Sequence, residues 1–340
     1  MFMGRFFSAW FKTKHSPPYY RLNDREDGTL KCFSLNDIKT ATRNLIQGRD
    51  DKLCCVITVR KGWIDEHTLA PSKPDSGFAI TVRKLNQVCH QDHNELLRII
   101  NIMGQLSHPN LAKLIGYCLE DIHPILVYDF SPEGSLDNHL YKRSSNVQPL
   151  SWKSRMKIAL DAATALAYLH GDEVNVIHGE LNTSNILIDS NHNAKIFDFG
   201  LNKNERFRRC QGFAVIYAAP EYIMTGYQTK MGDVYSFGLV LLEIMSGKCV
   251  FDRNRPRNER NLIEWAKPLL LNKCKIFKVM DCYIEGQYSP REAMKVACIV
   301  ICCLSETPKN RPNMDEVVTA LEQLQDSDDT IGTASPLCGN

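Results

Sequence analysis

The chain has 340 residues, 44% of them hydrophobic, which is enough to bury one large core or two lobes. The formal net charge of +2 is close to neutral and gives no indication of nucleic-acid binding. The longest apolar run, at residues 296–304, is too short to cross a bilayer and predicts a buried helix instead.

The thirteen cysteines include no Cys-x-x-Cys pair. Two adjacent pairs, Cys54–Cys55 and Cys302–Cys303, have poor geometry for zinc or for an ordinary disulfide. We therefore expect reduced thiols that serve as small apolar side chains.

Residues 1–30 are expected to form a flexible N-terminal segment with no secretory signal, because basic residues interrupt its aromatic start. Gly4 fits the N-myristoylation pattern if translation begins at Met3, which would make the segment a membrane anchor. If translation begins at residue 1, this glycine is internal and the segment is a flexible basic tail.

Hydrophobic patterning then predicts a small β-rich lobe over about residues 45–130. Ser34 is expected to cap a short helix within residues 33–44, just before this lobe. Residues 53–59 and 79–82, rich in Val, Ile and Thr, predict strands, and residues 91–104 predict an amphipathic helix. Residues 124–130 predict a buried strand that leads into a hinge.

From about residue 131 to residue 325 the pattern is helical. Ser151 is expected to cap a helix that runs past Leu169, and further helices are predicted at 232–246, 261–271, 290–304 and 313–325. The polar residues 326–340 predict a disordered tail. The predicted fold class is α+β, with a small β-rich lobe and a large helical lobe.

An ordered series of short motifs resembles the signature of protein kinases, which is His-Arg-Asp, Asn five residues later, then Asp-Phe-Gly. The chain has His178-Gly179-Glu180, then Asn185, then Asp198-Phe199-Gly200. Later residues that match the family are Glu221 of Ala-Pro-Glu, Asp233 and Arg311. The resemblance implies a bilobal protein kinase fold that binds ATP and Mg²⁺.

Within the kinases, residues 32–325 resemble the plant receptor-like cytoplasmic kinases, and most of all the branch that relays signals from immune receptors. The segments that carry this likeness are 33–44, 61–66, 104–111, 115–120 and 126–130. The resemblance implies receptor kinases and other cytoplasmic kinases as partners, no nucleic acid, and a place at the cytoplasmic face of the plasma membrane or in the cytoplasm.

Several positions that hold phosphates in the family are replaced. The three glycines of the phosphate-binding hairpin correspond to Lys52, Cys54 and Ile57, whose side chains would obstruct the close approach of backbone N–H groups. The lysine of the third strand is Arg83, which keeps the charge but not the compact ammonium, and its helix glutamate partner is Ile99. Glu95, one turn earlier, is either a substitute partner or a solvated side chain. The remaining nucleotide positions are Thr81, Tyr128, Asp129, Phe130 and Leu187.

The catalytic loop is also altered. Glu180 occupies the position of the catalytic aspartate, either as a longer base or as a structural carboxylate, and Asn182 replaces the lysine that supports the transferring phosphate. Asn185 and Asp198 keep the residue types of an Mg²⁺ site. Gly179 replaces the arginine that grips a phosphorylated activation loop, and residues 199–220 contain neither Ser nor Thr.

The frame of the fold is retained. His178 and Phe199 match the apolar column that links the lobes, Asp233 matches its anchor, and Glu221 and Arg311 match a buried ion pair. We therefore expect a pseudokinase, a kinase fold that regulates partners in receptor signalling, with plant defence as one setting. The alternatives are a weakly active Ser/Thr kinase and a decaying gene product without a stable function.

Overall fold

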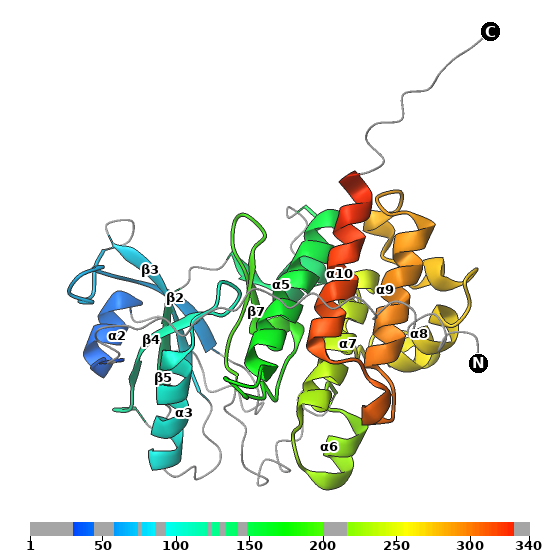
Figure 1. Ribbon diagram of the computed structural model, residues 1–340. Coiled ribbons are helices and arrows are strands. Elements are labelled where there is room, and N and C mark those ends of the chain that lie inside the picture. The colour runs from blue at the N-terminus through cyan, green and yellow to red at the C-terminus, as the bar shows by residue number, and fades with distance from the viewer. Residues whose placement is uncertain are drawn as a thin grey trace.

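The computed structural model describes residues 30–43, 58–73, 77–85, 93–121, 124–129, 133–141, 148–199 and 216–329. A small lobe with a twisted sheet lies beside a larger helical lobe (Figure 1). This is the expected α+β arrangement of a protein kinase. None of the helices in these ranges is long and apolar enough to span a membrane.

The small lobe contains a five-stranded sheet with strand order β1-β4-β5-β3-β2. The helix α2 (Leu35–Ala41) begins after Ser34, whose side chain accepts a hydrogen bond from the backbone N–H of Asp37, as predicted. The other elements are β1 (Lys31–Cys32), β2 (Thr58–Ile64), β3 (Phe78–Lys84), α3 (His93–Gln105), β4 (Lys113–Cys118) and β5 (Ile125–Asp129).

Both faces of this sheet are covered, which follows from the side-chain alternation along β5. Ile125 and Val127 belong to the apolar cluster that includes α2, whereas Leu126 and Tyr128 belong to the large core that includes α3. The near-continuous apolar sequence of β5 is therefore explained by burial on two sides.

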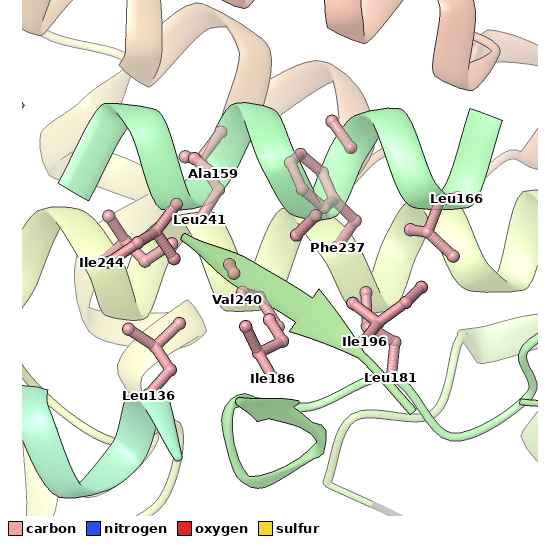
Figure 2. Packing of buried hydrophobic residues seen from close by; sticks show 14 of the residues in the cluster. Leu136, Ala159, Leu166, Leu181, Ile186, Ile196, Phe237, Val240, Leu241 and Ile244 are labelled. Atoms are coloured by element: carbon pink, nitrogen blue, oxygen red, sulfur yellow. The ribbon is translucent and has the colours of Figure 1, made fainter. Parts of the chain in front are cut away.

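The large lobe is organised around α7 (Lys230–Ser246), in which every residue from Asp233 to Ser246 is buried. Side chains of α7 pack against α5 (Trp152–His170) and against the short strands that carry Ile186 and Ile196 (Figure 2). The remaining elements are β6 (Gly134–Ser135), α4 (Leu136–Leu140), η1 (Thr183–Asn185), β7 (Ile186–Ile188), β8 (Ala194–Ile196), α6 (Pro220–Thr225), α8 (Leu262–Leu270), α9 (Pro290–Cys303) and α10 (Met314–Asp329).

The predicted helices are confirmed, including the Ser151 cap of α5, with one correction at the C-terminus. The helix α10 runs to Asp329, so residues 326–329 of the expected disordered tail are helical. No Gly or Pro occurs between Met314 and Gly332, so nothing in this stretch stops the helix at residue 325. The predicted strand at 53–59 is described only from Thr58, and residues 1–29 and 330–340 lie outside the described ranges.

Candidate functional site

Arg83 lies in β3, an interior strand between β5 and β2, and its side chain points toward Asp198 of the large lobe. It is 6% exposed. The neighbouring Lys84 points to the other face, as the alternation of a strand requires, and its Nζ lies 3.1 Å from Asp121 Oδ2.

The guanidinium of Arg83 forms an ion pair with the carboxylate of Asp198. Its Cζ atom also lies 5.1 Å from the ring centroid of Phe197, within the range of a cation–π contact. Burial lowers the pKa of Arg83 to about 10, an effect that Tyr128 and the carboxylate of Glu180 partly oppose. The side chain therefore remains a buried cation at neutral pH, with two acidic groups of the site in its field.

Asp198 is also held by the hydroxyl of Tyr128, which donates a hydrogen bond of 2.9 Å to Asp198 Oδ1. Burial raises the pKa of Tyr128 well above its ordinary value, so the hydroxyl stays protonated and remains a donor. Asp198 has a φ of 64°, a left-handed conformation that Asp adopts more readily than most residues. Both carboxylate oxygens of Asp198 are thus directed at groups of the small lobe.

The sequence places Ile99 where the family has a glutamate, and α3 accordingly supplies no carboxylate at this position. Ile99 is 3% exposed and packs in the main core. The side chain of Glu95 lies outside the described part of the chain, so its pairing with Arg83 stays a prediction. Asp198 is the partner of Arg83 that sequence reasoning did not identify.

The catalytic loop is anchored by Asp233 of α7, as expected. Its Oδ2 and Oδ1 accept hydrogen bonds of 2.8 Å from the backbone N–H groups of His178 and Gly179 respectively. The imidazole of His170 lies 2.9 Å from Asp233 Oδ2. Burial lowers the pKa of His178 to about 4, so this ring is neutral within the column that links the lobes.

Because Gly179 has no side chain, it leaves room for Gln228, a contact that the sequence did not predict. It has a φ of 86°, and a Cβ atom placed there would overlap the amide of Gln228. Gln228 Nε2 donates a hydrogen bond of 2.7 Å to the carbonyl of Gly179. The arginine position of the family is therefore taken by a glycine whose carbonyl is held by a glutamine from beyond α6.

The two asparagines of the loop support its backbone. Asn182 Nδ2 and Asn185 Nδ2 each donate a hydrogen bond of 2.9 Å to the carbonyl of Glu180, and Asn182 Oδ1 accepts one from the N–H of Ser184. Asn182 thus acts as a local cap and presents no cation to a phosphate. Asn185 Oδ1 is buried and makes no hydrogen bond.

Asn185 and Asp198 fit a bound Mg²⁺ by residue type, but the groups beside Asp198 in this structure compete with a metal ion. The unbonded oxygen of Asn185 is a suitable ligand by type, but Asp198 is already held by the Arg83 guanidinium and the Tyr128 hydroxyl. Among the described residues, no group of three or more His, Cys, Asp or Glu side chains could hold a metal ion. A divalent cation would have to displace a buried guanidinium.

The expected adenine positions are only partly described. Thr81, Tyr128 and Leu187 are buried, and Asp129 is half-buried. Phe130, the hairpin positions Lys52, Cys54 and Ile57, and the possible acylation site Gly4 all lie outside the described ranges.

Within the described residues, the structural positions that match the family keep their expected contacts. Glu221 and Arg311 form a bidentate ion pair, with contacts of 2.6 and 2.8 Å. His178 and Phe199 are buried, together with Met103 and Leu114 of the same column.

A second buried network was not predicted from the sequence. The hydroxyl of Tyr217, near the end of the activation segment, lies 2.8 Å from each carboxylate oxygen of Glu243 and shares its one proton between them. Burial raises the pKa of Glu243 to about 7.

Comparison with known proteins agrees with this architecture. The family model for protein tyrosine and serine/threonine kinases matches residues 57–321. The chain is 51% identical over 326 residues to Receptor-like cytoplasmic kinase 176 of Oryza sativa subsp. japonica, covering 92% of this chain and 82% of that protein. It is 49% identical over 311 residues to Serine/threonine-protein kinase BIK1 of Arabidopsis thaliana, covering 88% and 77%. The chain therefore belongs to the protein kinase family and, within it, to the receptor-like cytoplasmic kinases.

Proposed function

We propose that this chain is a pseudokinase, a regulatory or scaffolding member of receptor kinase signalling that does not transfer phosphate. The observation that carries the proposal is that a buried arginine, Arg83, occupies the position of the family's phosphate-holding lysine and lies against Asp198. The family uses ATP and Mg²⁺, and in its active members this aspartate holds the metal that bridges the phosphates. An aspartate neutralised by an internal cation is a poor ligand for a second one.

The size of the expected loss supports inactivity. Removing a single group that stabilises charge in a transition state often costs about 10²–10³-fold in rate. Here the strand lysine, its helix glutamate and the loop lysine are replaced by Arg83, Ile99 and Asn182. These losses do not add simply, yet each affects the positioning of the same phosphoryl group.

The proposed partners are receptor kinases and related cytoplasmic kinases, because the relatives in rice and Arabidopsis are named as receptor-like cytoplasmic and serine/threonine kinases. Defence signalling at the plasma membrane is the setting that the resemblance implies. The intact Glu221–Arg311 pair supports a stable surface for such partners, since this pair fixes the end of the activation segment against the large lobe.

A weakly active kinase is the second candidate, and one observation favours it. Asn185 Oδ1 is buried without a hydrogen bond, as expected of an oxygen that coordinates a ligand. Glu180 retains a carboxylate at the position of the catalytic base. On this alternative, ATP and Mg²⁺ would displace Arg83 from Asp198.

A thermal-shift titration separates the two candidates. A ligand that binds only the folded protein raises its stability, by about 2.7 kcal/mol at a concentration of 100 Kd. We expect Mg²⁺ to add nothing to the Tm measured with ATP alone. An Mg²⁺-dependent rise that is lost in Asp198→Asn would support the weak kinase. The matched control is Arg83→Met, which removes the cation beside Asp198. An Mg²⁺-dependent rise in Tm of this variant but not of the parent would mean that the arginine suppresses metal binding.

A further inference from the structure

Residues 248–283 of the large lobe differ in charge from the rest of the chain. They contain nine Lys or Arg and four Asp or Glu, a net charge of +5, whereas the whole chain carries +2. The remainder of the chain is therefore net negative. One of the four acids, Asp281, lies 2.6 Å from the fully buried Arg155 and does not offset charge at the surface.

The same segment exposes large apolar side chains. Eight such side chains are exposed among the described residues, and four of them lie here: Phe251 (40%), Leu271 (53%), Phe277 (44%) and Tyr283 (57%). Half of the exposed large apolar side chains among the described residues thus fall within this one basic segment, and a concentration of this kind indicates an interaction site more than scattered residues do.

The segment is a compact part of the fold. It comprises α8 and the short 3-10 turns η4 (Arg257–Glu259), η5 (Ile276–Lys278) and η6 (Cys282–Ile284). The helix α8 contacts both η4 and η5, and Phe251 pairs with Asn261 just before α8 begins. In Figure 1, α8 lies at the end of the large lobe that is remote from the small lobe. The nine residues of α8 span about 14 Å, so the segments at its two ends lie within one region of the surface.

The basic charge is strongest after α8. No Asp or Glu occurs between Trp265 and Met280. Lys273, Lys275 and Lys278 in this stretch are all exposed. Acids offset part of the segment's charge: Lys267 Nζ lies 2.9 Å from Glu306, and Arg255 Nε lies 3.5 Å from Asp252.

We propose that the surface formed by the two segments flanking α8 (residues 251–260 and 271–283), which we call the α8 face, binds a membrane that contains anionic phospholipids. Each lysine near such a leaflet strengthens binding about fivefold. Aromatic and aliphatic side chains on the same surface enter the headgroup region, which is how interfacial segments bind. Anionic headgroups match the lysines, and the boundary between headgroups and acyl chains accepts Phe277 and Leu271, so a membrane surface accounts for both features. The proposal does not depend on whether the chain transfers phosphate.

The test is co-sedimentation of the full chain, produced without acylation, with vesicles of phosphatidylcholine alone or with added phosphatidylserine. We expect binding only to the anionic vesicles, weakening as the salt concentration rises. The triple variant Lys273→Glu, Lys275→Glu, Lys278→Glu should bind on the order of 100-fold more weakly. Phe277→Ser should weaken binding roughly fivefold, with little dependence on salt, because it removes apolar contact only.

A matched triple variant distinguishes binding by the α8 face from a general effect of the net charge of the chain. Lys61→Glu, Lys153→Glu, Lys309→Glu changes the net charge equally at three exposed lysines outside the α8 face. This control should keep most of the binding. Equal losses in the two triple variants, or no binding of the parent to anionic vesicles, would overturn the proposal. Binding of the parent to polyglutamate but not to vesicles would also overturn it and would assign the face to an acidic protein.

Discussion

The substitution Arg311→Ala removes a side chain that makes four hydrogen bonds in the large lobe. Arg311 makes a bidentate pair with Glu221, at 2.6 and 2.8 Å, and its Nη1 and Nε also donate to the carbonyls of Met231 and Ser305, at 2.7 and 2.8 Å. The arginine side chain is 0% exposed and that of Glu221 is 16% exposed. Truncation therefore removes the cationic partner of a mostly buried carboxylate and one hydrogen bond from each of two carbonyls.

Breaking one side of such a pair costs about 3–5 kcal/mol. A typical domain is stable by only about 5–15 kcal/mol, so we expect a sharp fall in Tm and in expression of Arg311→Ala. Arg311 holds the pKa of Glu221 below its usual range, against the raising effect of burial. The stabilisation is thus present above the unfolded pKa of Glu221 and is lost as the pH falls through the folded pKa.

The assay is chemical denaturation of Arg311→Ala beside Lys309→Ala, which removes an exposed cation two residues away. The double variant Arg311→Ala, Glu221→Ala should be less destabilised than the sum of the single variants, because the pair is coupled. An unfolding free energy of Arg311→Ala within about 1 kcal/mol of the parent would refute the structural role of the pair.

Three further predictions follow from particular residues. Burial raises the pKa of Glu243 to about 7, so the parent should lose about 2 kcal/mol of stability between pH 5.5 and 8, a loss that denaturation of Glu243→Gln should not show. Gly179→Ala should destabilise the chain more than Gly286→Ala, since both positions have positive φ (86° and 78°) but only Gly179 faces another side chain; equal Tm values would contradict this. If translation begins at Met3, Gly4→Ala should release the protein from the plasma membrane in cell fractionation, whereas unchanged localisation would mean that a partner holds it there.

The fold could be predicted because its signals are local or ordered along the chain. The cap at Ser151 and the apolar spacing after it define α5, and the order of Asp198, Glu221 and Arg311 identifies the two lobes. The end of α10 was placed four residues too early, because polarity alone does not stop a helix that lacks Gly or Pro.

The contacts of the site could not be predicted in the same way. The sequence indicates that Arg83 lacks its helix glutamate, but not that the guanidinium turns to Asp198 instead. Tyr128 and Asp198 are 70 residues apart, and only the packing of the two lobes brings the hydroxyl to the carboxylate. Gln228 likewise fills the space beside Gly179, and no periodicity or spacing links these two residues.

The central claim is that this kinase fold does not transfer phosphate. The most direct test is incubation of the purified parent and of Asp198→Asn with γ-labelled ATP, Mg²⁺ and a general protein substrate, beside an active kinase as a control. We expect no transfer by the parent above the level of Asp198→Asn, and signalling in cells that survives the same substitution. Robust autophosphorylation of the parent that Asp198→Asn abolishes would contradict the pseudokinase assignment and leave the fold assignment intact.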